Sequence, residues 1–228
     1  MAFINTVPSK DQLAENLWVS FNMGDDNTAK RIIFIGNSIT RHGVAEHIGW
    51  THDWGMAASD ISKDYVHLTA AALEKKLGKI DFCVTQAADW ERNYTDKELL
   101  VRQYNDARNF CADYVVLRIG ENVIRETFDY DKFVEAYVDM AHFFASKEGA
   151  KIVMTDLMWN NNEIDGKLND AIHEAAKRLN LDVIEMNDLG KDDKYAAKGL
   201  FWHEGVAGHP GDFGMQTISD RIVKALGF

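Results

Sequence analysis

The chain has 228 residues, of which 46% are hydrophobic and 27% are charged, a composition typical of a globular domain with a substantial core. Its formal net charge of −11 at pH 7 repels phosphate backbones and anionic lipid, so nucleic acids and membrane surfaces are not expected partners. No segment reaches the ~18 consecutive apolar residues of a membrane span. Residues 1–16 also lack the basic start and apolar run of a secretory leader, which predicts a cytoplasmic protein unless a leader was removed upstream.

The segments with secondary-structure periodicity alternate along the chain. A helix is expected near residues 10–21, within an N-terminal helical extension, residues 1–29. Five apolar runs without polar alternation then predict buried strands, at residues 31–35, 80–85, 114–119, 151–157 and 182–186. Helical spacing follows each strand, at residues 65–77, 96–111, 129–146, 164–179 and 212–226. This alternation predicts right-handed crossovers and a five-stranded parallel sheet in a three-layer α/β/α sandwich. Since no Pro- or Gly-rich linker interrupts the chain, residues 1–228 are expected to form a single domain.

The first candidate chemical group is Ser38, in the sequence Gly36-Asn37-Ser38-Ile39-Thr40 directly after the first strand. A serine at a sharp strand-to-helix turn presents its hydroxyl at the carboxyl edge of the sheet, and a glycine allows such a turn. Taken alone, the pattern also fits an ordinary turn. The connection that follows, residues 40–63, is much longer than the ~2–6 residues that are usual. We expect this insertion to form a wall or lid, because parallel sheets bind ligands at that edge.

The insertion and the two cysteines are candidate metal or redox sites. Several potential ligands lie close together in the sequence: His42, Glu46, His47, His52 and Asp53. Their spacing matches no compact zinc pattern, so no metal and no cofactor are expected. Cys83 and Cys111 are expected to be buried, reduced thiols, since neither has an electropositive sequence neighbourhood.

Two further polar motifs follow later strands. Gly120-Glu121-Asn122 comes after the third strand, where an amide side chain can donate to a developing oxyanion or can instead satisfy loop backbone. His209 lies in a glycine-rich loop, residues 203–212, between the last strand and the final helix. A histidine there can reach the sheet edge and act as a general base, although a single histidine is often structural.

Serine, amide and histidine thus all follow carboxyl strand ends, in the order Ser, Asn, His. This order resembles the SGNH (GDSL-like) hydrolase family over residues 31–228. Residues 36–39 resemble its Gly-Asp-Ser-Leu/Ile block, with Asn37 in place of Asp. Residues 120–122 resemble its Gly-x-Asn block, and residues 204–210 resemble its Asp-Gly-Val-His-Pro block. The resemblance implies a flavodoxin-like SGNH hydrolase fold without a cofactor.

The resemblance also implies roles for individual residues. Ser38 would attack an acyl carbonyl, His209 would take its proton, and the Ser38 N–H and the Asn122 amide would form part of the oxyanion hole. The family has an acid three residues before the histidine, where this chain has Val206. Glu204 is the expected orienting carboxylate, the alternatives being a solvent-exposed Glu204 and a dyad without an acid.

The family's second block, a glycine that supplies a backbone donor after the second strand, has no counterpart in residues 86–93. Another residue can supply a backbone N–H, and Glu91 or Trp90 lies nearest by position. Glu91 is the expected third member of the oxyanion hole.

The implied activity is that of a serine esterase that removes a small acyl group, such as acetate, from a carbohydrate or another polar ester. Aromatic residues near the active edge are candidate surfaces for stacking on a sugar: Trp50, Trp54, Trp90, Trp159 and Trp202. The alternatives are a catalytically inactive, carbohydrate-binding relative and a flavodoxin-like nucleotide binder. The latter is disfavoured because no Gly-x-Gly-x-x-Gly opens the first helix. The expected partner is a small-molecule or glycan ester, and no oligomeric state is predicted.

Overall fold

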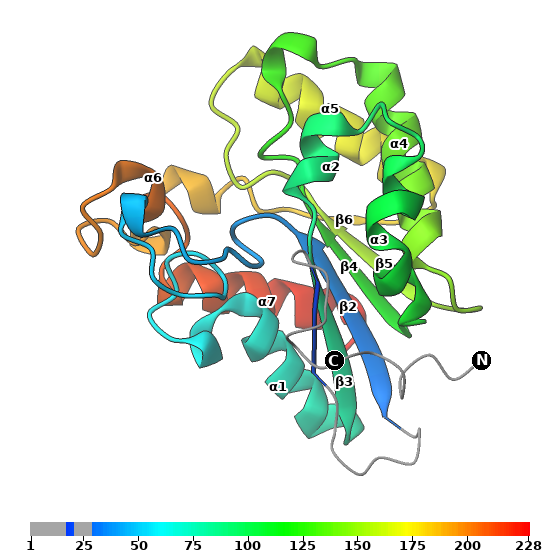
Figure 1. Ribbon diagram of the computed structural model, residues 1–228, viewed down its shortest axis with the longest axis horizontal. Helices are drawn as coiled ribbons and strands as arrows, with labels where there is room; N and C mark the ends of the chain where they lie inside the picture. Colours follow the sequence, from blue (N-terminus) through cyan, green and yellow to red (C-terminus); the bar gives the residue numbers. More distant parts are fainter. Residues whose placement is uncertain (1–16, 21–28) are drawn as a thin grey trace.

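The computed structural model describes residues 17–20 and 29–228 of the chain (Figure 1). One sheet has the strand order β1-β3-β2-β4-β5-β6. Its strands are β1 (Leu17–Ser20), β2 (Lys30–Gly36), β3 (Ile80–Gln86), β4 (Tyr114–Arg118), β5 (Lys151–Thr155) and β6 (Val183–Ile184). Strands β2 to β6 are mutually parallel, and β1 pairs antiparallel with β3. The predicted five-stranded parallel sheet is confirmed, with β1 as an additional edge strand.

Helices cover both faces of the sheet (Figure 1). One face packs against α1 (Tyr65–Leu77) and α7 (Asp212–Leu226), and the other against α3 (Leu99–Asn109), α4 (Tyr130–Phe144) and α5 (Glu163–Arg178). Two short helices, α2 (Ala88–Asn93) and α6 (Glu204–Ala207), lie in loops at the carboxyl ends of the strands. The three-layer α/β/α sandwich is therefore confirmed.

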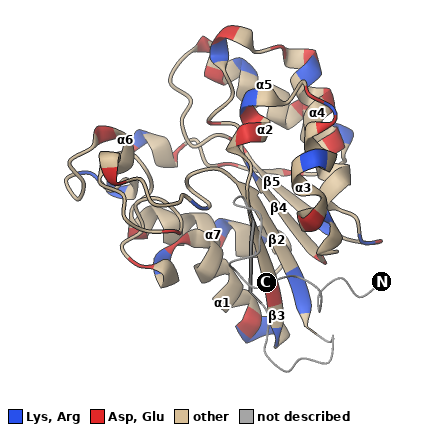
Figure 2. Ribbon diagram, viewed as in Figure 1, with Lys and Arg blue, Asp and Glu red and all other residues tan. Residues whose placement is uncertain are grey.

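Strand β2 shows why its sequence is a continuous apolar run. Ile33 and Ile35 belong to the core beneath α3, α4 and α5, whereas Ile32 and Phe34 belong to the core beneath α1 and α7. All four side chains are buried, because alternate residues of a strand point to opposite faces and both faces are covered. Burial of each such side chain contributes about 1.5–3 kcal/mol. Lys, Arg, Asp and Glu lie mainly on the helices and loops (Figure 2).

Some predicted elements differ from the observed ones. The helix expected near residues 10–21 is wrong over Leu17–Ser20, which form β1, and the rest of that segment lies outside the described residues. Strand β1 gives hydrogen-bond partners to the backbone along the otherwise open edge of β3. The helix expected over residues 96–111 is the shorter α3, and α2 before it was not predicted. Strands β5 and β6 end earlier than expected. No helix of residues 29–228 is long and apolar enough to cross a bilayer.

The strand order fixes where a ligand site is expected. The parallel strands have the flavodoxin-like order, with β2 between β3 and β4. The connection after β2 leads to α1 on one face, and the connection after β4 leads to α4 on the other (Figure 1). Such a divergence opens a crevice at the carboxyl ends of the two strands. Ser38 follows β2 and Asn122 follows β4, so both residues lie at this crevice.

The insertion, residues 40–63, is folded back onto the turn that carries Ser38. Met56 donates a backbone hydrogen bond to the carbonyl of Ser38 (2.9 Å). A Cβ on Gly55 would lie 2.6 Å from the carbonyl oxygen of Ile39, so only glycine permits this approach. Farther along, the backbone N–H and the hydroxyl of Ser59 donate to the carboxylate of Asp212, the first residue of α7 (2.8 Å each). These contacts attach the insertion both to the turn and to the last helix.

Candidate active site

Ser38 sits in a compact turn directly after β2. A Cβ on Gly36 would lie 1.7 Å from the hydroxyl oxygen of Thr40, so the turn requires a glycine there. The backbone N–H groups of Thr40 and Arg41 donate to the carbonyl of Asn37 (2.9 and 3.0 Å). The side-chain oxygen of Asn37 also accepts the Ile39 N–H (3.2 Å), as in an Asx turn. The turn thereby holds Ser38 at the carboxyl edge of the sheet.

The Ser38 hydroxyl and the His209 ring are in hydrogen-bond contact, with 2.8 Å between Ser38 Oγ and His209 Nε2. On the other side of the ring, His209 Nδ1 lies 2.6 Å from the carbonyl oxygen of Gly205. A carbonyl can only accept, so Nδ1 carries the proton and donates it to Gly205. Nε2 then has a free lone pair and accepts from the Ser38 hydroxyl. This is the arrangement of a nucleophile beside its general base.

The expectation that Glu204 orients His209 is not met, because Nδ1 of His209 hydrogen-bonds to another group. The Glu204 side chain is exposed, and the acceptor it was expected to supply is the backbone carbonyl of Gly205. The reason lies in α6, which was not predicted. The residues between Glu204 and His209 form a helical turn, so the carbonyl of Gly205 faces the side chain four residues later. Ser38 and His209 thus pair without a carboxylate on Nδ1, and Glu204 is exposed, so the structure agrees with both alternatives that the sequence left open.

The environment of His209 favours its neutral form. Burial lowers the pKa of His209 to about 4; the hydrogen bond to Gly205 opposes this shift, and the nearby Arg118 guanidinium adds to it. The edge of the Trp159 ring packs against the imidazole, with 5.7 Å between ring centroids. His209 is therefore ready to accept a proton at neutral and mildly acidic pH.

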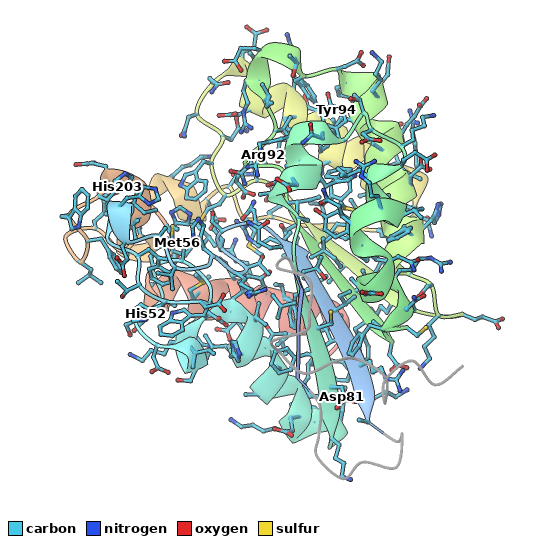
Figure 3. The ribbon with its side chains drawn as sticks, viewed as in Figure 1. His52, Met56, Asp81, Arg92, Tyr94 and His203 are labelled. Carbon is cyan, nitrogen blue, oxygen red and sulfur yellow. The ribbon has the colours of Figure 1, made fainter. Side chains whose placement is uncertain are left out.

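A cleft of about 310 Å³ opens above Ser38 and His209. Asn122 also lines this cleft. The structure therefore brings together the three residues that carry the resemblance to the SGNH family. The other lining residues are His42, Ile48, Met56, Gln86, Ala88, Arg92, His203, Gly205 and Val206. Arg92 enters from α2, whereas His203 and Met56 enter from the loops of α6 and the insertion (Figure 3). No Asp or Glu is among the lining residues, despite the acidic composition.

Asn122 has a donor available for the cleft. Its amide nitrogen, Nδ2, donates one hydrogen bond to Oε2 of Glu91 (2.6 Å). A primary amide has two N–H groups, so a second donor remains. In the described part of the chain the Ser38 N–H has no acceptor. Both groups are free to receive a negative oxygen.

Glu91 does not fill the second oxyanion block as expected. Its backbone N–H donates to the carbonyl of Ala87 within the first turn of α2 (3.1 Å), so the group is already used. Trp90, the alternative to Glu91, is buried in the core and does not line the cleft. Within this segment the cleft is lined by Gln86, Ala88 and Arg92, and the Ala88 N–H donates to the Gln86 side chain (2.9 Å).

The predicted tryptophans separate into three groups. Trp50 and Trp90 are fully buried, so the expectation that they contact substrate is wrong. Trp54 is half-buried, and its ring nitrogen donates to the carbonyl of Ala58 (3.0 Å). Trp159 is also half-buried, and its ring contacts His209.

Trp202 alone of the five is strongly exposed, at 73%. Its ring lies against Gly49, where a Cβ would be 2.4 Å from the indole nitrogen. It also makes an edge contact with His203, which lines the cleft (5.5 Å between centroids). Trp202 therefore stands at the rim of the cleft.

Four polar residues of the cleft were not assigned to it from the sequence, and one of them, Gln86, accepts the Ala88 N–H (2.9 Å). His42 contacts the carbonyl of Gly43 through Nδ1 (2.7 Å), Arg92 pairs with Asp89 (2.7 Å), and His203 has a buried Nδ1 without a partner in the described chain. Of these residues only His42 could have been found from the sequence, because it belongs to the histidine-rich insertion. No group of three or more His, Cys, Asp or Glu suited to a metal ion occurs among residues 29–228.

Several solved structures with a similar fold are described as hydrolases, esterases or lipolytic proteins. LAE5, an alpha/beta hydrolase enzyme from the metagenome of Lake Arreo in Spain, is 18% identical with a TM-score of 0.58, over 87% of this chain and 95% of that chain. The acetyl xylan esterase AlAXEase is 21% identical with a TM-score of 0.55, over 86% and 99%. A putative lipolytic protein of the G-D-S-L family from Desulfitobacterium hafniense is 11% identical with a TM-score of 0.53, over 86% and 99%.

The chain has the SGNH hydrolase fold. No protein-family model and no curated protein sequence matches it. At these low identities the structural likeness concerns the fold, and the residues that carry chemistry must be judged from their own geometry. Within this SGNH fold, Ser38, Asn122 and His209 lie at the crevice where the strand order reverses.

Proposed function

We propose that the protein is a serine esterase or acylhydrolase in which Ser38 is the nucleophile and His209 its base. The observation that carries this proposal is the contact of 2.8 Å between Ser38 Oγ and His209 Nε2, with the Nδ1 proton held by Gly205. A structural histidine needs no free lone pair aimed at a serine. Here the ring presents that lone pair to a hydroxyl at the floor of an open cleft.

The reaction follows from this arrangement. The Ser38 oxygen attacks the ester carbonyl while its proton passes to His209 Nε2. The Ser38 N–H, the second N–H of Asn122 and the Ala88 N–H would stabilise the oxyanion, the last after Gln86 releases it. His209 then gives its proton to the leaving alcohol, which produces an acyl-enzyme. Water, deprotonated by His209, attacks the acyl carbonyl and releases the acid, and the proton returns to Ser38.

In this mechanism the Gly205 carbonyl takes the part that an acid plays in a triad. It fixes the tautomer and orientation of the ring through the Nδ1 hydrogen bond. A carbonyl dipole stabilises the imidazolium less than a carboxylate does, because it carries no net charge. We therefore propose a Ser38–His209 dyad, with Gly205 as its orienting group.

The proposed substrate is a small acyl ester, such as an acetate, of a carbohydrate or another polar alcohol. A cleft of about 310 Å³ suits a short acyl group and part of an alcohol better than a long chain. Ile48, Met56 and Val206 give an apolar portion, whereas Gln86 and Arg92 give polar groups. Trp202 offers an exposed ring at the rim, on which a sugar could stack. The likeness in fold to an acetyl xylan esterase agrees with this proposal.

Hydrolysis of p-nitrophenyl esters of increasing acyl length tests the proposal. We expect kcat/KM to be highest for acetate or propionate and to fall by more than about tenfold at octanoate, because the cleft has little room for a long chain. Acetylated oligosaccharides, assayed by acetate release, test the alcohol side with Trp202→Ala as the variant. An absence of hydrolysis with every ester would contradict the proposed function, and a preference for octanoate would contradict the short-acyl proposal.

The pH dependence of kcat/KM tests the role of His209. A base with a pKa of about 4 is almost fully deprotonated at pH 5.5, so kcat/KM should stay within about twofold between pH 5.5 and pH 7.5. Activity should then fall as the pH is lowered toward 4, where His209 becomes protonated. An acid limb centred near the ordinary histidine value of about 6.5 would contradict this assignment. Protein recovered from acid and assayed at pH 7 provides the control for unfolding.

A further inference from the structure

A buried polar network lies beneath the Ser38 turn and connects three loops. Its members are Asn37, Glu91, Arg118, Glu121 and Asn122, and the side chains of Glu91 and Arg118 are completely buried. Buried charges are costly unless each is paired or hydrogen-bonded. The hydrogen bonds of the network therefore indicate what each charged group does there.

Glu91 is the member that contacts both strand ends at the crevice. Its Oε1 accepts from the Gly120 N–H (2.5 Å) and from Nδ2 of Asn37 (3.0 Å), and its Oε2 accepts from Nδ2 of Asn122 (2.6 Å). The Asn122 backbone N–H makes a longer contact with Oε1 (3.4 Å). One carboxylate thus holds the residue before the nucleophile and the proposed oxyanion donor.

We propose that Glu91 is a positioning residue, whose carboxylate aims the second N–H of Asn122 into the cleft and fixes Asn37 beneath the Ser38 turn. This inference rests on the proposed function, since a precisely placed donor matters only if an oxyanion forms. An amide that is free to rotate would present its carbonyl oxygen to the cleft for part of the time. Two charge-assisted contacts, one to each asparagine, prevent such a rotation.

The chemistry of the contacts requires a carboxylate at this position. Both oxygens of Glu91 face only N–H donors, which a carboxylate accepts and a protonated or amide group cannot fully accept. Burial and the neighbouring Glu121 carboxylate raise the pKa of Glu91, while the hydrogen bonds from Gly120, Asn37 and Asn122 oppose the shift. Arg118 pairs with Glu121 (2.8 Å) and so offsets the charge of the second carboxylate.

The test is the Glu91→Gln variant, analysed as a cycle with Asn122→Ala. Glutamine keeps the size but turns one NH₂ group toward a donor, so we expect kcat to fall about 10- to 100-fold with KM within about threefold. In the Asn122→Ala background the same change should lower kcat clearly less than in the wild-type background, because only the contact of Glu91 with Asn37 is then left to lose. Additive losses, or an unchanged kcat in Glu91→Gln, would overturn the proposal.

Two further variants separate positioning from general destabilisation. Asp81→Asn alters another buried carboxylate, at the opposite end of β3 from the cleft (Figure 3), and should leave kcat within about twofold. Glu91→Asp keeps the charge but shortens the reach to Asn122, so it should lose kcat even if Glu91→Gln does not fold. A kcat in Glu91→Asp equal to that of the wild type would also overturn the proposal.

A readout that does not depend on turnover distinguishes this inference from the proposed function. In ¹⁵N-labelled protein the side-chain amide of Asn122, assigned by its loss in Asn122→Ala, should show two widely separated proton resonances, because one proton is bonded to a carboxylate. The separation should decrease in Glu91→Gln. Unchanged resonances in Glu91→Gln would refute the hydrogen bond by which Glu91 orients Asn122. A changed separation in a protein without esterase activity would refute only the proposed function.

Discussion

We expect alanine at Ser38 or at His209 to lower kcat for ester hydrolysis by about 10⁴- to 10⁶-fold, with KM within a few fold of the wild-type value. In the proposed mechanism both side chains act in the same proton transfer, across the 2.8 Å contact between Oγ and Nε2. The double variant should therefore be no slower than the worse single variant, since the two losses are not additive. The measurement is burst and steady-state kinetics with p-nitrophenyl acetate.

Glu204→Gln is the matched control for the loss at His209. It alters an exposed carboxylate in the same loop, and the Nδ1 proton is held by the Gly205 carbonyl instead. We expect its kcat to stay within about threefold of the wild-type value. A loss of about 10⁴-fold in Glu204→Gln would show that the carboxylate orients the histidine during turnover, as in a Ser-His-acid triad.

Asn37→Asp is expected to destabilise the protein by about 3–5 kcal/mol, although it restores the aspartate that the SGNH family has at this position. The amide nitrogen of Asn37 donates to two carboxylates, Glu91 (3.0 Å) and Glu121 (2.6 Å). Aspartate would remove both hydrogen bonds and add a third carboxylate to a network that contains one arginine. Chemical denaturation at neutral pH measures the loss, and kcat should fall with it because the Ser38 turn is built on Asn37.

The origin of this loss can be checked by changing the pH. If repulsion among buried carboxylates is the cause, the difference in unfolding free energy from wild type should shrink as the pH falls and a carboxyl group becomes protonated. Asn105→Asp makes the same chemical change on the exposed face of α3 and should alter stability by less than about 0.5 kcal/mol. An Asn37→Asp variant as stable as wild type at neutral pH would contradict the described network.

The fold could be predicted from the sequence where burial determines the pattern of apolar residues. The run from Ile32 to Ile35 is apolar without alternation because both faces of β2 are covered, and the same holds for the other central strands. Strand β1 and helix α2 were missed for different reasons. Strand β1 has four residues, too few for an alternating pattern to be told apart from the helical spacing expected there. Helix α2 has six residues, which do not complete two turns and so give no helical periodicity.

The candidate site could be predicted where a side chain follows a strand end. Ser38 and Asn122 met this condition, whereas His209 comes from the loop before α7, and all three line one cleft. The orienting group could not be predicted in this way, because any residue at position 205 offers the same backbone carbonyl. For Glu91 the sequence correctly predicted a position near the oxyanion site, but it assigned the role to the backbone N–H instead of the carboxylate. Its N–H is used within α2, and its carboxylate faces the network.

The most direct test of the Ser38–His209 dyad is covalent labelling with a fluorophosphonate, located by mass spectrometry of peptides. A serine activated by a neighbouring base reacts with such a probe, whereas ordinary surface serines do not. We predict one phosphonyl group on the peptide that contains Ser38 in wild-type protein, strongly reduced labelling in His209→Ala and unchanged labelling in Glu204→Gln. Folded wild-type protein that stays unlabelled at Ser38, or that is labelled equally in His209→Ala, would contradict the account.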